Sequence, residues 1–173
     1  RILEIIRLTS PDSKFYQASS VEIFSGSSAV QTENDIVLPR SPYGISKAYA
    51  YFTVESYRSI YNIYACNGIL FNHESPRRGE DFVTKKIVST LKRMSSNRKS
   101  EETLELGNID VLKDWGHAKD FVRAKWEIMQ LPSPEDFIVA TGEQHTVREF
   151  VEIAGRYFGY NIQWEGAGLQ EIG

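Results

Sequence analysis

The chain has 173 residues, about the length of one domain, and its composition of 41% hydrophobic and 25% charged residues excludes an intrinsically disordered protein. A formal net charge of -3 gives no electrostatic basis for binding nucleic acid or an anionic membrane, and no apolar run approaches the ~20 residues of a membrane-spanning helix. The single cysteine, Cys66, cannot form an internal disulfide and suits a reducing compartment, so we predict a cytoplasmic protein.

The first half of the chain shows helical and strand-like patterns in turn. In chain order they predict a helix over 2–8, a strand over 14–18, an irregular stretch over 21–28, a proline-punctuated loop over 37–42, a helix over 43–62, a strand over 64–71 and a loop over 73–79. The apolar positions expected for the long helix are Tyr49, Phe52, Val54 and Tyr57.

The second half continues the alternation. Its expected elements are a helix over 81–94, a surface loop over 95–102, a strand over 103–106, a helix over 119–131, a strand over 137–140, a helix over 147–157 and an edge strand over 162–164. Thr146 and Glu149 have the spacing of a capping box, and Gly159 is expected to end the helix that they begin. Helices that alternate with strands predict an α/β fold with parallel strand pairing.

The stretch over residues 41–47, Ser-Pro-Tyr-Gly-Ile-Ser-Lys, opens the long helix. Proline suits the first turn of a helix, and Tyr43 and Lys47 then lie four residues apart on one face. An ammonium beside a phenol favours the phenolate and lowers the pKa of the tyrosine, which makes it a usable base. Taken alone, the same spacing also fits an ordinary surface pair.

Further runs of sequence accompany this stretch, namely Phe-Tyr-Gln-Ala-Ser-Ser-Val-Glu over 15–22, Leu-Phe-Asn-His-Glu-Ser-Pro-Arg-Arg-Gly over 70–79, Asp-Trp-Gly-His-Ala-Lys-Asp over 114–120, Ile-Val-Ala-Thr-Gly over 138–142 and Val-Arg-Glu-Phe over 147–150. With them, the chain from about residue 15 onward resembles the extended short-chain dehydrogenase/reductase family and, within it, the GDP-mannose 4,6-dehydratases.

The resemblance implies catalytic roles for Ser20, Glu22, Tyr43 and Lys47. Tyr43 would take the proton of the sugar 4-hydroxyl while Lys47 holds the nicotinamide ribose, and Ser20 would hydrogen-bond the same sugar oxygen. Glu22 would remove the C5 proton, a step that a 4-epimerase or a simple reductase does not need. Without the flanking motif, Glu22 would be a solvated loop carboxylate. The family usually has threonine and then serine where this chain has Ser20 and Val21.

The resemblance also implies NADP as cofactor, bound by Tyr43, Lys47, His73 and Arg78, and a nucleotide-sugar substrate bound by Asn72, Lys86 and Lys113. The family usually has arginine where this chain has Lys113, and lysine lacks the bidentate fork of arginine. The charged side chains that follow Asn72 have a second interpretation, in which they only solvate a surface loop. No role is assigned to Glu74 or Arg77.

Other polar and aromatic residues carry structural expectations. Asp114 and His117 are expected to cap and orient the following helix, and Trp115 and Trp126 to pack rather than to stack on a base. The three histidines, His73, His117 and His145, have no metal-ligand spacing, so we predict no metal site.

The chain has 12 glycines, but they never form the Gly-x-Gly-x-x-Gly loop of a dinucleotide-binding fold. We therefore expect the C-terminal part of a Rossmann-like doubly wound parallel sheet with an attached substrate-binding region, truncated at both ends. Residues 1–72 would hold the later part of the dinucleotide-binding fold, and residues 73–173 a mixed substrate-binding region with returning α/β elements.

The family forms dimers and tetramers, so the resemblance implies a homo-oligomer at full length. The chain alone is expected to be inactive and either weakly stable or self-associating, because half a parallel sheet exposes strand edges. Two alternatives stay open: an epimerase or reductase of another nucleotide sugar, and a catalytically silent assembly or binding module.

Overall fold

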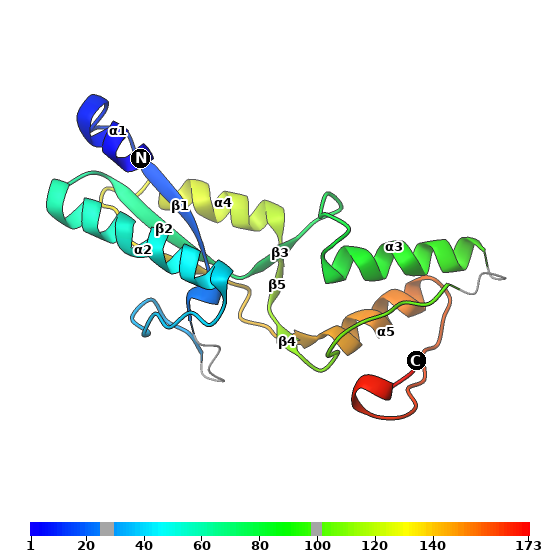
Figure 1. Cartoon of the computed structure of the whole chain (residues 1–173). Coiled ribbons are helices and arrows are strands. Elements are labelled where there is room, and N and C mark those ends of the chain that lie inside the picture. The colour runs from blue at the N-terminus through cyan, green and yellow to red at the C-terminus, as the bar shows by residue number, and fades with distance from the viewer. Residues whose placement is uncertain (25–29, 98–101) are drawn as a thin grey trace. The chain divides into compact units, whose positions relative to one another are not determined.

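The computed structural model describes residues 1–24, 30–97 and 102–173 (Figure 1). They divide into two compact units, residues 1–73 with 116–141, and residues 74–115 with 142–173. Residues 116–141, which follow the expected boundary at 72, thus belong to the first unit. Within the described ranges, no helix has both the length and the hydrophobicity to cross a membrane.

A three-stranded parallel sheet forms the centre of the first unit. It consists of β1 (Phe15–Ser20), β2 (Ala65–Leu70) and β6 (Phe137–Val139), in the order β1-β2-β6. Phe15 pairs with Ala65 and Gly68 pairs with Phe137. The middle strand, β2, is buried at every position. The predicted parallel α/β sheet is therefore confirmed.

Helices cover both faces of this sheet (Figure 1), as expected for a doubly wound fold. The elements are α1 (Ile2–Thr9), the 3₁₀ turn η1 (Val21–Ile23), α2 (Pro42–Tyr61) and α4 (Ala118–Ile128). Neighbouring residues of β2 point to opposite faces of the sheet. Asn67 Nδ2 donates to a backbone carbonyl of α2, whereas Cys66 Sγ lies 3.6 Å from the sulfur of Met129, directly after α4.

The start of α2 follows from local sequence. Ser41 Oγ accepts a hydrogen bond of 2.9 Å from Gly44 N, and Pro42 occupies the first turn, where it needs no N–H partner. Asn62 ends the helix in the left-handed region, with φ 52°. These signals confirm the predicted boundaries to within one residue.

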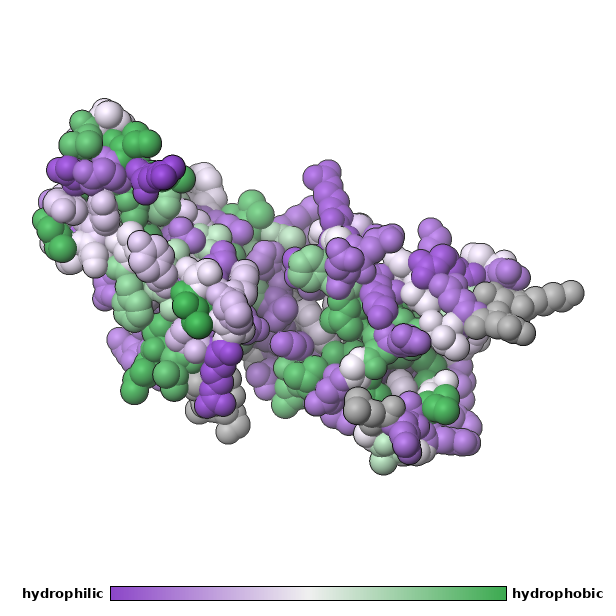
Figure 2. All heavy atoms as spheres, in the orientation of Figure 1, coloured by the Kyte–Doolittle hydropathy of each residue, from purple (hydrophilic) through white to green (hydrophobic). Residues whose placement is uncertain are grey.

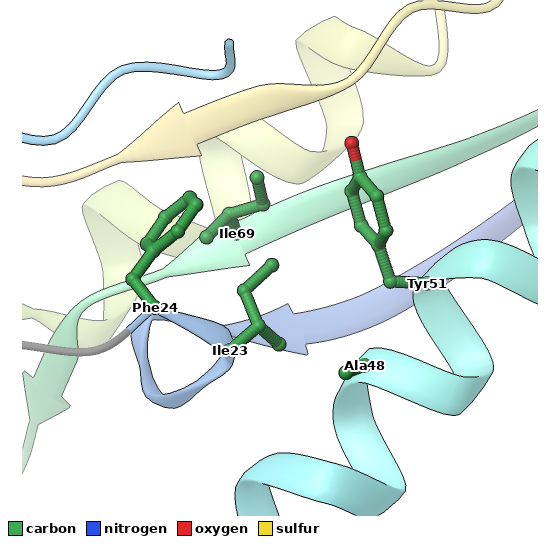
Figure 3. Packing of buried hydrophobic residues seen from close by; sticks show 5 residues of the cluster. All are labelled: Ile23, Phe24, Ala48, Tyr51 and Ile69. Atoms are coloured by element: carbon green, nitrogen blue, oxygen red, sulfur yellow. The ribbon is translucent and has the colours of Figure 1, made fainter. Parts of the chain in front are cut away.

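The buried face of α2 differs from the expected one. Its buried residues are Gly44, Ala48, Tyr51 and Val54. Ala48 and Tyr51 pack against Ile23, Phe24 and Ile69 (Figure 3). Tyr49 and Phe52 are 75% and 49% exposed, so the prediction that they face the core is wrong. The small residues at 44 and 48 decide the packing, because they let the helix approach the sheet closely.

The second unit packs two helices, α3 (Val83–Ser96) and α5 (Val147–Tyr157), around a core of Ile87, Leu91, Ile109, Val147 and Val151. Both hydrogen bonds of the predicted capping box form at the start of α5, and Gly159 follows its end with φ 83°. Two short strand pairs remain. β3 (Asn72–Glu74) pairs with β5 (Trp115–His117), and β4 (Leu112–Lys113) pairs antiparallel with β7 (His145–Thr146). The 3₁₀ turn η2 spans Gly168–Gln170.

Two predicted strands, over 103–106 and 162–164, are absent, because the described chain forms no strand ladder there. Leu104, Leu106, Ile162 and Trp164 instead pack their side chains against the core of the second unit. Side-chain burial without a backbone partner therefore produced the strand-like pattern. Residues 25–28 of the expected irregular stretch and 98–101 of the expected surface loop lie outside the described residues.

Candidate active site

The carboxyl end of β1 carries Ser20 and Glu22. Ser20 is the last residue of the strand and only 9% exposed, and its Oγ accepts a hydrogen bond of 3.3 Å from Glu22 N. The hydroxyl therefore caps the 3₁₀ turn that presents Glu22, whose side chain is exposed. In open α/β sheets, ligands bind at this end of the strands.

Tyr43 and Lys47 occupy the first two turns of α2, on one face as predicted. The ammonium of Lys47 lies 5.5 Å from the centroid of the Tyr43 ring and donates a hydrogen bond of 2.8 Å to Ala18 O. This bond ties the lysine to β1, two residues before Ser20. Tyr43 is 55% exposed, so its phenol is open to a ligand.

Gly44 joins these two parts of the site. A Cβ atom at Gly44 would overlap with the backbone oxygen of Glu22, so only glycine permits this approach without a shift of the backbone. The first turn of α2 therefore lies directly against η1. Val21, where the family usually has serine, is the first residue of η1 and packs against the core, so its methyl groups replace a hydroxyl by apolar contact.

His73 lies just after β2 and is held by two contacts. Its Nδ1 lies 3.0 Å from Phe71 O, and because a carbonyl only accepts, Nδ1 carries the proton. The imidazole stacks on Phe121 of α4, with centroids 4.8 Å apart and planes at 20°. Among the described residues Nε2 has no hydrogen-bond partner, so it is available to a ligand. Asn72, the preceding residue, begins β3 and is half-buried.

Lys125 of α4 was not predicted as a site residue. It lies on the helix face shared with Phe121 and Ile128, both of which are buried. Burial lowers the pKa of Lys125, and the positive charge of Lys47 adds to this effect. The spacing 121, 125 and 128 was the available signal, since it puts a lysine in an otherwise apolar stripe.

The second unit carries the other predicted binding residues. The guanidinium of Arg78 lies over the ring of Phe82, with Cζ 3.4 Å from the centroid. Lys86 Nζ donates to Glu105 O at 2.6 Å on the exposed side of α3. Lys113 is half-buried in β4, opposite His145. The structure brings the four catalytic candidates together in the first unit, whereas these three belong to the second.

The structural expectations have mixed outcomes. His117 caps α4, since its Nδ1 accepts from Lys119 N at 3.1 Å. Asp114 accepts a hydrogen bond of 2.8 Å from Gly142 N. Trp115 packs against the core of the second unit, but Trp126 is 65% exposed, so the packing prediction is wrong for Trp126. Within the described ranges, no three His, Cys, Asp or Glu residues are arranged to hold a metal ion.

Comparison with solved structures shows a shared fold. RMD from Pseudomonas aeruginosa, complexed with NADPH, superimposes with a TM-score of 0.85 at 22% identity, over 94% of this chain and 56% of that one. The likeness supports the assignment of the sheet to the Rossmann-like folds.

Sequence comparison identifies the family. A GDP-mannose 4,6-dehydratase of Vibrio cholerae is 49% identical over 176 residues, which cover all of this chain and 47% of the relative. The GDP-mannose 4,6 dehydratase of Homo sapiens is 50% identical over 161 residues, which cover 92% of this chain and 43% of the relative. The chain thus spans about half the length of these curated relatives. Since the profile of the family described as GDP-mannose 4,6 dehydratase also matches residues 1–173, the chain belongs to this family.

Proposed function

We propose that this chain, in a protein of its relatives' full length, takes part in the dehydration of GDP-mannose to GDP-4-keto-6-deoxymannose. The observation that carries the proposal is the junction of β1 and α2, where Ser20, Glu22, Tyr43 and Lys47 occupy neighbouring turns in backbone contact. Membership of the family favours this reaction over an epimerase or reductase of another nucleotide sugar.

Tyr43 is the first base in the proposed mechanism. Its phenol removes the proton of the sugar 4-hydroxyl as C4 becomes a ketone. The ammonium of Lys47 lies 5.5 Å from the centroid of its ring. Ser20 donates a hydrogen bond to the same sugar oxygen and stabilises the carbonyl that forms.

Glu22 is the second base. Once C4 is a ketone, the C5 proton is acidic, and the exposed carboxylate of Glu22 removes it. The C6 hydroxyl then takes up a proton and leaves as water. The hydride that left C4 would return to C6 while C5 regains a proton, so that the net change is the loss of one water molecule. A carboxylate in this role distinguishes a dehydratase from an enzyme that only oxidises or reduces C4.

The residues present fit NADP. The ammonium of Lys47 and the open Nε2 of His73 suit a ribose or an amide, and the guanidinium of Arg78 suits a phosphate. A bound nicotinamide dinucleotide supplies the reversible hydride storage that the reaction needs. We assign Asn72, Lys86 and Lys113 to the nucleotide sugar, with Lys86 and Lys113 near its diphosphate.

We also propose that the full-length protein is a cytoplasmic homo-oligomer, a dimer or a tetramer. Hydrophobic residues of α1 gather at the surface (Figure 2), where Ile2, Ile5 and Leu8 are each at least 60% exposed. Ile45, Tyr49 and Phe52 of α2 are exposed as well, which supports an apolar contact between subunits.

The chain by itself is proposed to be inactive, because its sequence carries no Gly-x-Gly-x-x-Gly loop for a pyrophosphate. It should also self-associate or melt broadly, since β1 has a single strand neighbour among the described residues. A sharp two-state melt of a monomer, followed by circular dichroism, would contradict this expectation.

The test of the function is a turnover assay on the protein at its relatives' full length. GDP-mannose and NADP are supplied, and mass spectrometry measures the loss of one water from the nucleotide sugar. Formation of that product supports the dehydratase. A protein that binds NADP but yields no such product would redirect the assignment to another nucleotide sugar or to an epimerase or reductase.

A further inference from the structure

The turn between β3 and α3 is tied down around Arg78. Ser75 O accepts a hydrogen bond of 3.0 Å from Arg78 N, and Ser75 Oγ accepts one of 3.1 Å from Arg77 N. Lys85, in the first turn of α3, donates to Pro76 O at 3.0 Å. The backbone that carries Arg78 is therefore fixed both within the turn and to the helix that follows.

The carboxylate of Glu74 holds one edge of the guanidinium. Its Oε2 lies 3.2 Å from Nε of Arg78, an ion pair that lacks the geometry of a hydrogen bond, and it accepts a hydrogen bond of 2.7 Å from Thr84 Oγ1. Thr84 is only 5% exposed, and the side chain of Glu74 is 19% exposed, so water competes little for the carboxylate. Thr84 thus fixes Glu74, and Glu74 in turn faces Arg78.

The ring of Phe82 holds the face of the same guanidinium, at 3.4 Å from Cζ to the ring centroid. With one edge and one face occupied, the group has little freedom to rotate. Among the described residues, the two terminal nitrogens of Arg78 have no hydrogen-bond partner. These nitrogens form the planar fork that binds a phosphate through two parallel hydrogen bonds.

We propose that Glu74 is a positioning residue, which acts with Thr84 and Phe82 to present the terminal nitrogens of Arg78 to a phosphate of the dinucleotide. The inference rests on the proposed function. A purely structural role for Glu74, which ends β3 and accepts the hydrogen bond from Thr84 of α3, would change stability without changing cofactor affinity. If Glu74 only neutralised Arg78, its removal would tighten phosphate binding.

The test is a double-mutant cycle in the protein at its relatives' full length, with NADPH affinity measured by fluorescence and turnover measured with GDP-mannose. We expect Glu74→Gln to weaken NADPH binding about fivefold, the order of coupling between neighbours in one ion-pair network. Thr84→Val should weaken it in the same direction. The kcat at saturating NADP should stay at the wild-type value in both variants.

The cycle separates positioning from other effects. In the background of Arg78→Ala, Glu74→Gln should cause no further loss of affinity, because the group that Glu74 orients is gone. Glu102→Gln is the matched control, since Glu102 pairs with Arg93 at 2.7 Å in the same unit and its loss should leave NADPH affinity unchanged.

Two results would overturn the inference while the proposed function stands: wild-type affinity or tighter binding in Glu74→Gln, and losses that add in the double variant. A wild-type protein that binds neither NADP nor NADPH would instead overturn the proposed function, and the inference with it.

Discussion

Asp136 links α2 to the sheet, and its replacement provides a test of how the first unit is held together. Arg58, near the end of α2, donates to both carboxylate oxygens, at 2.6 and 2.8 Å. Asn67 of β2 donates to Oδ1 from its backbone N–H at 2.7 Å and from its side chain at 3.2 Å. Asp136 immediately precedes β6, so one carboxylate joins a helix and two strands.

The expected loss follows from burial. The side chain of Asp136 is 9% exposed and that of Arg58 is 22% exposed. Removing one partner of a fully buried ion pair costs about 3–5 kcal/mol, and this partial exposure reduces the expected cost of Asp136→Asn to about 2–3 kcal/mol.

The pH dependence has a definite sign. Burial alone raises the pKa of Asp136, but the hydrogen bonds from Arg58 and Asn67 outweigh it, and the net pKa lies below its usual value. The ionised carboxylate therefore stabilises the folded state above about pH 4, the pKa expected when unfolded, and this contribution is lost as pH falls through the lower folded value. The difference between wild type and Asp136→Asn should shrink as the solution is acidified.

The assay is urea denaturation of the protein at its relatives' full length at pH 7, with turnover measured under native conditions. Glu127→Gln is the control, because the Arg123–Glu127 pair is 80% and 55% exposed and its loss should cost less than about 0.5 kcal/mol. Arg58 lies about 22 Å along α2 from Tyr43, so turnover per folded molecule should not change. A loss in Asp136→Asn as small as that of the control would refute the reasoning.

Three further predictions concern single side chains. Tyr43→Phe should lower kcat by at least about 100-fold, since it removes the first base, and near-native turnover by mass spectrometry would end that assignment. Glu22→Gln should permit oxidation at C4 but stall elimination, so reduced nicotinamide should accumulate on the enzyme. If substrate binds but no absorbance of reduced nicotinamide appears, the assignment of separate roles to Tyr43 and Glu22 is wrong. Tyr16→Phe should be neutral or stabilise by up to about 1 kcal/mol in urea denaturation, because the Tyr16 hydroxyl is buried without a partner among the described residues, and a loss of stability would count against this.

The sequence predicted those features that depend on nearby residues. Ser41 and Pro42 located the start of α2, and the capping box of Thr146 and Glu149 located the start of α5, because each signal is a hydrogen bond or a fixed φ within one turn. The spacing of Tyr43 and Lys47 was sufficient for the same reason, since four residues on a helix bring two side chains onto one face.

Features that depend on distant residues were not predicted. The strands β4 and β7 are two residues long, so their pairing leaves no periodic pattern, while Leu104 and Leu106 alternate without forming a strand. Lys125 lies near Lys47, and Arg58 pairs with Asp136. In both cases the two residues are 78 positions apart in the sequence. Only the folded sheet, with helices on both faces, brings such pairs together.

The two ends of α2 are held by different kinds of contact. At its first turn, Gly44 brings the helix against the backbone of Glu22, and Lys47 holds β1 through Ala18, so the catalytic candidates are placed by short backbone contacts. Near its last turn, Arg58 binds the buried carboxylate of Asp136, which anchors the helix by charge. Since the two ends use different interactions about 22 Å apart, a substitution at one end should change turnover and a substitution at the other should change stability.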